Sequence, residues 1–174
     1  MKIAEMFLTE QSEGGSYAGV RFDKSTKDAI AQYMQENDIP NPIPVDKLHT
    51  TLLYSRKFLP DYTPKGKISP VWVGTPTTFD VWESKGKLRD EEPKKCLVLE
   101  YDCDKLDDRH EELMEEHGAT YDFPTYKTHI TLSYDIGDLD IKDLPDITDT
   151  LHKIKIVSEY GENLDLDWSK TKGK

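Results

Sequence analysis

The apolar and polar positions in the first half of the chain predict a strand, a helix and a second strand. Residues 16–22 are rich in β-favouring side chains and follow a pair of glycines. Residues 25–37 then repeat apolar side chains at helical spacing. Three prolines within residues 37–44 end this helix, and the chain passes into a strand-like run around His49.

The second half predicts a similar series of elements. Residues 77–84 and 95–102 have the composition of strands, with a charged connection between them. Residues 104–118 show the clearest helical pattern and end on a glycine, and a strand-like run around His129 follows. Residues 152–168 alternate on both sides of a glycine, which predicts a final hairpin.

These elements predict an α+β fold in a single domain, residues 1–174, with two similar halves. Apolar residues make up 36% of the chain, which suffices for one compact core and is too little for two. Residues 56–76 are rich in Pro, Gly and Lys, so we expect an irregular loop there with one short strand around Trp72. Residues 169–174 are expected to be a disordered tail.

Charge and cysteine content exclude several classes of function. The chain has 23 Lys and Arg against 34 Asp and Glu, a net charge of −11, so a broad face that binds large nucleic acids is not expected. The first ten residues do not have the pattern of a signal peptide or of a membrane span, and we expect a cytoplasmic protein. Cys96 and Cys103 lie outside any zinc or disulfide pattern and are interpreted as packing residues.

A four-residue pattern, His-x-Thr-Leu, occurs once in each half, beginning at His49 and at His129. Alternate side chains of a strand face the same side, so His49 shares a face with Thr51, and His129 shares a face with Thr131. A single histidine in a strand is more often structural than catalytic. The repetition favours a shared chemical role over two unrelated core histidines.

Paired imidazoles and paired hydroxyls suit the cleavage of a phosphodiester. The reaction needs a base for the nucleophile, an acid for the leaving oxygen, and donors for the charged phosphate oxygens. Such a site needs no metal and no other cofactor. Two protonated imidazoles in one cleft repel, so the pair should titrate in two steps and give a bell-shaped rate profile. The sequence leaves open which histidine is the base.

The two motifs resemble the signature of the two-histidine (2H) phosphoesterase superfamily. The whole chain is most similar to the phage (T4-like) anti-CBASS family of nucleases, through "GGSYAGVRF", "FDVWESKG" and "SEYGEN" as well as the motifs. The resemblance implies two pseudo-symmetric α+β lobes, with antiparallel-rich sheets around a central cleft and helices outside. It also implies that the four motif residues are catalytic.

The resemblance further implies a set of substrate contacts. Tyr17 and Trp82 match aromatic positions that hold a nucleobase. Glu159 is the best match for a carboxylate that contacts the base, with Glu162 as the alternative. A base can stack on an aromatic ring such as that of Tyr17, which follows two glycines.

The implied activity is metal-independent hydrolysis of the 3′,5′ linkages of cyclic di- and trinucleotide messengers, which lets a phage evade CBASS immunity in the host cytoplasm. The ribose 2′-hydroxyl would be the nucleophile. The alternatives are a related enzyme acting on linear 2′,5′-oligoadenylate or on RNA 2′,3′-cyclic phosphate, and a non-catalytic protein that sequesters cyclic nucleotides. The oligomeric state is open.

The acidic composition requires a local positive site for an anionic substrate. Candidate cations are Arg21, Lys47, Arg56 and Lys127. The loops at 56–76 and 85–95 are candidates for a lid, because of their composition. His110 and His117 lie seven residues apart on the predicted helix, without the spacing of a metal pair, and are expected to be surface residues.

Overall fold

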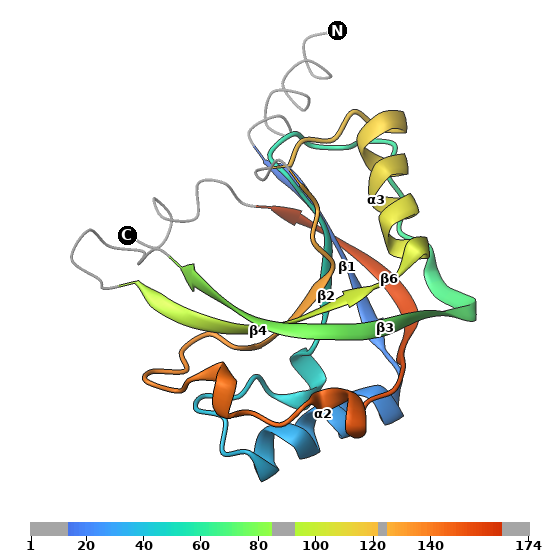
Figure 1. Cartoon of the computed structure of the whole chain (residues 1–174). Helices are drawn as coiled ribbons and strands as arrows, with labels where there is room; N and C mark the ends of the chain where they lie inside the picture. The colour runs from blue at the N-terminus through green and yellow to red at the C-terminus, as the bar shows by residue number, and fades with distance from the viewer. Residues whose placement is uncertain (1–13, 85–92, 122–124, 165–174) are drawn as a thin grey trace, which may run out of the picture.

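Six antiparallel strands form one sheet in the computed structural model, which describes residues 14–84, 93–121 and 125–164 (Figure 1). The strand order is β2-β1-β6-β3-β4-β5. The strands are β1 (Gly15–Phe22), β2 (Thr50–Ser55), β3 (Gly66–Ser84), β4 (Lys94–Asp102), β5 (His129–Ser133) and β6 (Ile154–Leu164). The helices are α2 (Lys24–Glu36), α3 (Asp104–Glu116) and the short 3-10 helices η1 (Val45–Lys47), η2 (Ile141–Asp143) and η3 (Ile147–Asp149). The α+β prediction is confirmed, and a single sheet replaces the expected pair of sheets.

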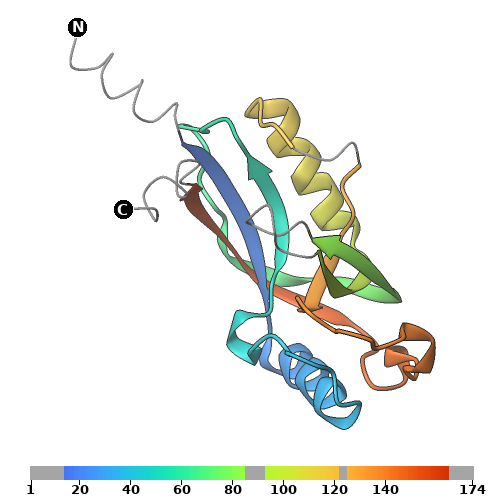
Figure 2. The same cartoon turned by 90° about the vertical axis from the view of Figure 1, so that its left-hand side faces the viewer.

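Both long helices lie where the sequence predicted them, and each buries an apolar stripe against the sheet. On α2, Ile30 and Met34 are buried, and on α3, Leu106 and Leu113 are buried. Gly118 has a positive φ of 65° just beyond α3, as expected for a glycine that ends a helix. Figure 2 shows α3 beside β2, and α2 at the other end of the sheet.

The irregular loop predicted for residues 56–76 is wrong over its second part, because β3 already begins at Gly66 and runs for 19 residues. Its first part pairs with β6 and its second part with β4. Pro70 and Pro76, which suggested a loop, lie where the register of these pairings shifts. A proline is tolerated at such irregularities, since no ladder hydrogen bond is required of its nitrogen.

The final hairpin predicted around Gly161 is also wrong, because β6 continues as one strand through this residue. Gly161 pairs with Ala18 in the ladder between β6 and β1. A Cβ atom at this position would lie 2.9 Å from Cε2 of Tyr62, so the glycine permits a close approach and makes no turn. The predicted positions beyond residue 164, and the expected tail at 169–174, lie outside the described residues.

The two edge strands of the sheet, β2 and β5, are connected by side chains. The Thr50 hydroxyl on β2 donates to the main-chain oxygen of His129 on β5 at 2.8 Å. Its single hydrogen is then used, so the Tyr101 hydroxyl donates to Thr50 at 2.7 Å. Tyr126, in the segment before β5, adds a second link by donating to the main-chain oxygen of Thr51 at 2.8 Å. The opposite edges of the strand order therefore meet, and both histidine motifs lie at that junction.

Within the ranges that the structure describes, no helix is both long enough and apolar enough to cross a membrane.

Replacing Thr50 with valine should lower the free energy of unfolding by about 1–3 kcal/mol, because it leaves the buried Tyr101 hydroxyl and the His129 carbonyl without their partner. Urea unfolding measures the change. Thr77→Val is the matched control, since Thr77 donates to a strand carbonyl from an exposed position, and it should change stability by less than about 0.5 kcal/mol. Equal effects of the two substitutions would contradict the junction.

Candidate active site

His49 and His129 are held in the same way at the two edge strands. His49 immediately precedes β2, and His129 is the first residue of β5. Nδ1 of each ring lies within hydrogen-bond distance of the main-chain oxygen two residues earlier, 2.9 Å from Lys47 and 2.8 Å from Lys127. A carbonyl oxygen only accepts, so Nδ1 carries a hydrogen in both rings. Nε2 is therefore the atom of each imidazole that can exchange a proton with a ligand.

The surroundings of His129 favour its neutral form. Burial lowers the pKa of His129, the nearby charge of His49 lowers it further, and the hydrogen bond with Lys127 opposes these effects in part. The Trp82 ring lies 4.3 Å from the His129 ring, centroid to centroid, at 55°. Trp82 is held in turn by donating from Nε1 to Oδ2 of Asp80 at 2.9 Å. The structure thus places Trp82, which the sequence analysis named as a substrate contact, next to His129 on the same face of the sheet.

Tyr17 and Thr51 lie together beside the other histidine. The Tyr17 hydroxyl is 3.0 Å from Oγ1 of Thr51, and its ring packs edge-on against His49 at 6.4 Å between centroids. Burial raises the pKa of Tyr17 well above its usual range, so the phenol remains protonated. Thr131 is half-buried on the same face of β5 as His129. His49 therefore shares a face with Thr51, and His129 shares a face with Thr131, as the sequence predicted.

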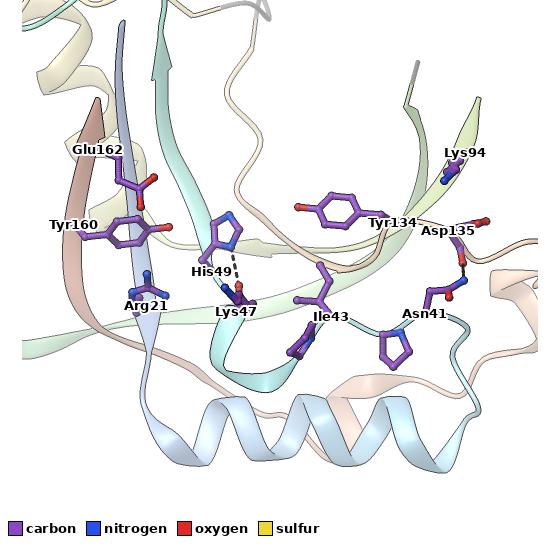
Figure 3. A pocket seen from close by; sticks show the side chains of 12 residues that line it. Arg21, Asn41, Ile43, Lys47, His49, Lys94, Tyr134, Asp135, Tyr160 and Glu162 are labelled. Carbon is purple, nitrogen blue, oxygen red and sulfur yellow. Dashed lines mark hydrogen bonds between the residues drawn. The ribbon is translucent and has the colours of Figure 1, made fainter. Parts of the chain in front are cut away.

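A cavity of about 670 Å³ opens beside His49 (Figure 3). Its described lining consists of residues from β1, β6, the segment that follows α2, the start of β4 and the residues after β5: Arg21, Asn41, Pro42, Ile43, Pro44, Lys47, His49, Lys94, Tyr134, Asp135, Tyr160 and Glu162. Among the predicted site residues, His49 and Glu162 belong to this described lining. The sequence did not single out Tyr134, Tyr160 or Lys94, because each looks like an ordinary strand or loop residue when taken alone.

The structure places Glu159 away from this cavity, in a buried ionic network. Only 2% of the residue is exposed, and its carboxylate accepts hydrogen bonds from Nε of Arg109 at 2.9 Å and from Nη2 at 3.0 Å. The Tyr62 hydroxyl donates to the same carboxylate at 2.8 Å. Glu162, three residues later, is exposed and lines the cavity. The acidic run "SEYGEN" therefore combines a structural carboxylate with a carboxylate that a ligand can reach.

Two of the four candidate cations line the cavity. Arg21 and Lys47 belong to the described lining, and Cζ of Arg21 lies 4.3 Å from the centroid of the Tyr160 ring. Such cation–π contact fixes the guanidinium over the ring. Arg56 and Lys127 are exposed and do not appear in that described lining. The cavity therefore offers the local positive charge that an acidic protein needs to bind an anion.

The expectation that His110 is a surface residue is wrong. Its ring stacks on Tyr126, 4.1 Å between centroids and 10° between planes, and its Nδ1 lies 2.8 Å from the main-chain oxygen of Leu52. Burial lowers the pKa of His110. Helix α3 thereby supports β2 from outside the cavity. Over the described part of the chain, no three His, Cys, Asp or Glu side chains gather as ligands for one metal ion.

These features define an α+β protein with a cavity beside one of two matching histidine strands. Comparison with known proteins agrees with the expected family. The family model "Anti-CBASS protein Acb1" matches residues 14–171. The protein of that name from Acinetobacter phage Ac42 is 40% identical over 154 residues, which cover 88% of this chain and 93% of the relative. The chain therefore belongs to the Anti-CBASS protein Acb1 family.

Further relatives of the same name extend over most of this chain. That of Enterobacteria phage T4 is 33% identical over 155 residues, covering 89% of this chain and 91% of the relative. That of Vibrio phage KVP40 is 33% identical over 168 residues, covering 97% of both. A solved structure, TT0787 of Thermus thermophilus, is similar with a TM-score of 0.48 and 14% identity, over 84% of this chain and 82% of that one.

Replacing Glu159 with glutamine should destabilise the protein by about 3 kcal/mol, because it removes the buried charge partner of the Arg109 guanidinium and leaves only the half-exposed Glu112 as a carboxylate partner among the described residues. The same change at Glu162 is the matched control and should leave the free energy of unfolding within about 0.5 kcal/mol of wild type. Chemical denaturation of both variants makes the comparison. A stable Glu159→Gln variant would contradict the structural role of this carboxylate.

Proposed function

We propose that the protein is a metal-independent phosphodiesterase that opens cyclic di- and trinucleotide signals of CBASS, in the cytoplasm of an infected bacterium, so that a phage evades this immunity. The observation that carries the proposal is the matched pair of imidazoles, each with Nδ1 tied to a main-chain oxygen and Nε2 left for proton transfer. Membership of a family named for its action against CBASS supports the biological role.

The proposed architecture is the two-lobed, pseudo-symmetric one of 2H phosphoesterases. Supporting it, the two histidine strands occupy equivalent places, one at each edge of the sheet. Each histidine is bound by the residue two positions before it, and each strand buries the side chains on its opposite face. One half of the sheet thus repeats the local geometry of the other, as two lobes around a cleft would.

In the proposed reaction His129 is the base, because burial and the charge of His49 favour its neutral form near pH 7. Its Nε2 removes the proton from the ribose 2′-hydroxyl, whose oxygen attacks the adjacent phosphorus. The bond from phosphorus to the 5′ oxygen breaks, and Nε2 of His49 gives its proton to that oxygen. The product carries a 2′,3′-cyclic phosphate. In the second step His49 takes a proton from water, the water oxygen attacks the phosphorus, and the bond to the 2′ oxygen breaks as His129 returns a proton to it, which yields a 3′-phosphate.

The two motif threonines are proposed to stabilise the charge on the phosphate oxygens. Tyr17 supports this role for Thr51, since a hydroxyl that accepts from Tyr17 keeps its own hydrogen for the phosphate. Thr131, on the face of His129, would donate from the other side. This assignment makes Tyr17 a support for the catalytic threonine as well as a ring for the base to contact.

Substrate binding is proposed to use the cavity beside His49. Glu162 takes the base-contact role first given to Glu159, since Glu159 is buried in its ion pair while Glu162 lines the cavity. Trp82 is proposed to hold a base beside His129. Arg21 and Lys47 would attract the phosphates, which reconciles an anionic substrate with the net charge of −11.

The protein should open 3′,3′-cGAMP and a cyclic trinucleotide in excess EDTA, and His49→Ala and His129→Ala should each reduce the rate at least about 100-fold. Mass spectrometry reads the products. His152→Ala is the control, because His152 is exposed and lies outside the described lining of the cavity. Linear 2′,5′-oligoadenylate and RNA 2′,3′-cyclic phosphate run beside the cyclic substrates. Loss of cleavage in EDTA, or recovery of intact ligand, would contradict the proposal.

The rate should follow a bell-shaped pH profile. Activity rises with pH as His129 loses its proton, and the midpoint of this limb should lie below 6.5, since the pKa of His129 is lowered from that value. Activity falls again when the acid is deprotonated. Measurement of kcat/KM between about pH 5 and about pH 9 tests both limbs. A rate that changes in only one direction over this range would argue against two proton carriers.

A further inference from the structure

The histidine repeat is longer than four residues, because a tyrosine follows each histidine by five positions. These residues are Tyr54 and Tyr134, so both halves read His-x-Thr-Leu-x-Tyr. Both belong to the exposed large side chains, 37% exposed for Tyr54 and 56% for Tyr134. The two histidine strands thus carry large, exposed aromatic rings at equivalent positions. The four-residue motif alone does not include these rings.

A β-bulge in each strand turns the tyrosine toward the histidine face. In a regular strand, a residue five positions after the histidine would lie on the opposite face. On β2, however, Thr51 pairs with Gly19 and Leu53 pairs with Ala18, so one extra residue lies between them. An extra residue reverses the alternation that follows it. Tyr54 thereby returns to the side of His49.

The same irregularity occurs on β5. Thr131 pairs with Val98, and Ser133 pairs with Leu97, again with one residue between the paired positions. The extra residue in both strands is the leucine of the motif. Burial agrees, because two consecutive side chains are buried at this point of each strand: Leu52 and Leu53 on β2, and Leu132 and Ser133 on β5. Tyr134, directly after β5, therefore lies on the side of His129 and Thr131.

Tyr134 presents its ring to the cavity. Tyr134 and Tyr160 point toward His49 from opposite sides (Figure 3). Among the described residues, none forms a hydrogen bond with the Tyr134 hydroxyl, so the side chain has no polar contact there that would explain its position. Tyr54 differs, because its ring already packs edge-on against Tyr17 at 6.4 Å. Of the two repeated tyrosines, Tyr134 is the one available to a ligand in the cavity.

We propose that Tyr134 is a stacking platform for the second nucleobase of the cyclic oligonucleotide, the base remote from the phosphate under attack. The inference rests on the proposed function and adds a residue that determines which rings are accepted. An aromatic face binds a base of any sequence by stacking, and cations in the same cavity hold the phosphates. Arg21 covers one face of Tyr160, which leaves Tyr134 as the more open ring.

Equilibrium binding of a 2′-deoxy cyclic dinucleotide, 3′,3′-c-di-dAMP, tests the inference. This probe lacks the hydroxyl nucleophile, so binding is measured without turnover. Tyr134→Leu should weaken binding about tenfold, equivalent to about 1.4 kcal/mol, while Tyr134→Phe should stay within about twofold of wild type. An analogue with one base replaced by hydrogen should bind equally to wild type and to Tyr134→Leu, because the base that stacks is missing.

Each other outcome overturns the inference, and the failures are distinguishable. If wild type opens 3′,3′-cGAMP but Tyr134→Leu binds the deoxy probe normally, the inference fails and the proposed function stands. If Tyr134→Phe and Tyr134→Leu weaken binding equally, the Tyr134 hydroxyl and not the face of its ring makes the contact. If the one-base analogue loses affinity in Tyr134→Leu as well, the effect is a structural disturbance. If wild type binds no cyclic dinucleotide, the proposed function fails together with the inference.

Discussion

The buried hydroxyl of Thr50 joins the two strands on which the candidate chemistry depends. Thr50 lies between His49 and Thr51 in the chain, and its hydroxyl donates to the main-chain oxygen of His129. The two edges of a six-stranded sheet have no ladder between them, so their separation depends on this side-chain contact together with the main-chain hydrogen bond from Ile43 to Leu132. Tyr101 completes the hydrogen bonds of Thr50 at a site closed to water, where a lost partner is costly. The relative position of the two imidazoles follows from this junction.

Burial divides the remaining polar residues into structural and accessible groups. Arg109 and Glu159 form an ion pair that fastens α3 to β6, and Tyr62 completes its hydrogen bonds. His110 binds the main chain of β2 from the same helix. These contacts attach α3 to β6 and to β2. The lining of the cavity includes cations, two carboxylates and aromatic rings, which are groups that can exchange water for an anionic, base-containing ligand.

The sequence predicted the helices and the motif strands because their signals are local. Periodicity marks α2 and α3, and strand alternation puts His129 and Thr131 on one face. The continuous course of β3 was not predictable, since two prolines are compatible with a strand only where the register shifts, and the partner strands set the register. The roles of Glu159 and Glu162 could not be separated either. Their difference depends on Arg109, which is 50 residues distant along the chain.

The central claim is that the two imidazoles act on the same phosphate. A crystal structure of the protein with 3′,3′-c-di-dAMP bound tests it most directly, because the probe cannot react by the proposed route. The account predicts Nε2 of His49 and Nε2 of His129 on opposite sides of one phosphate, with His49 within about 3.2 Å of the 5′ oxygen. Nε2 of His129 should face the carbon that carries the hydroxyl in a ribonucleotide. A phosphate bound against only one histidine, or away from both, would contradict the account.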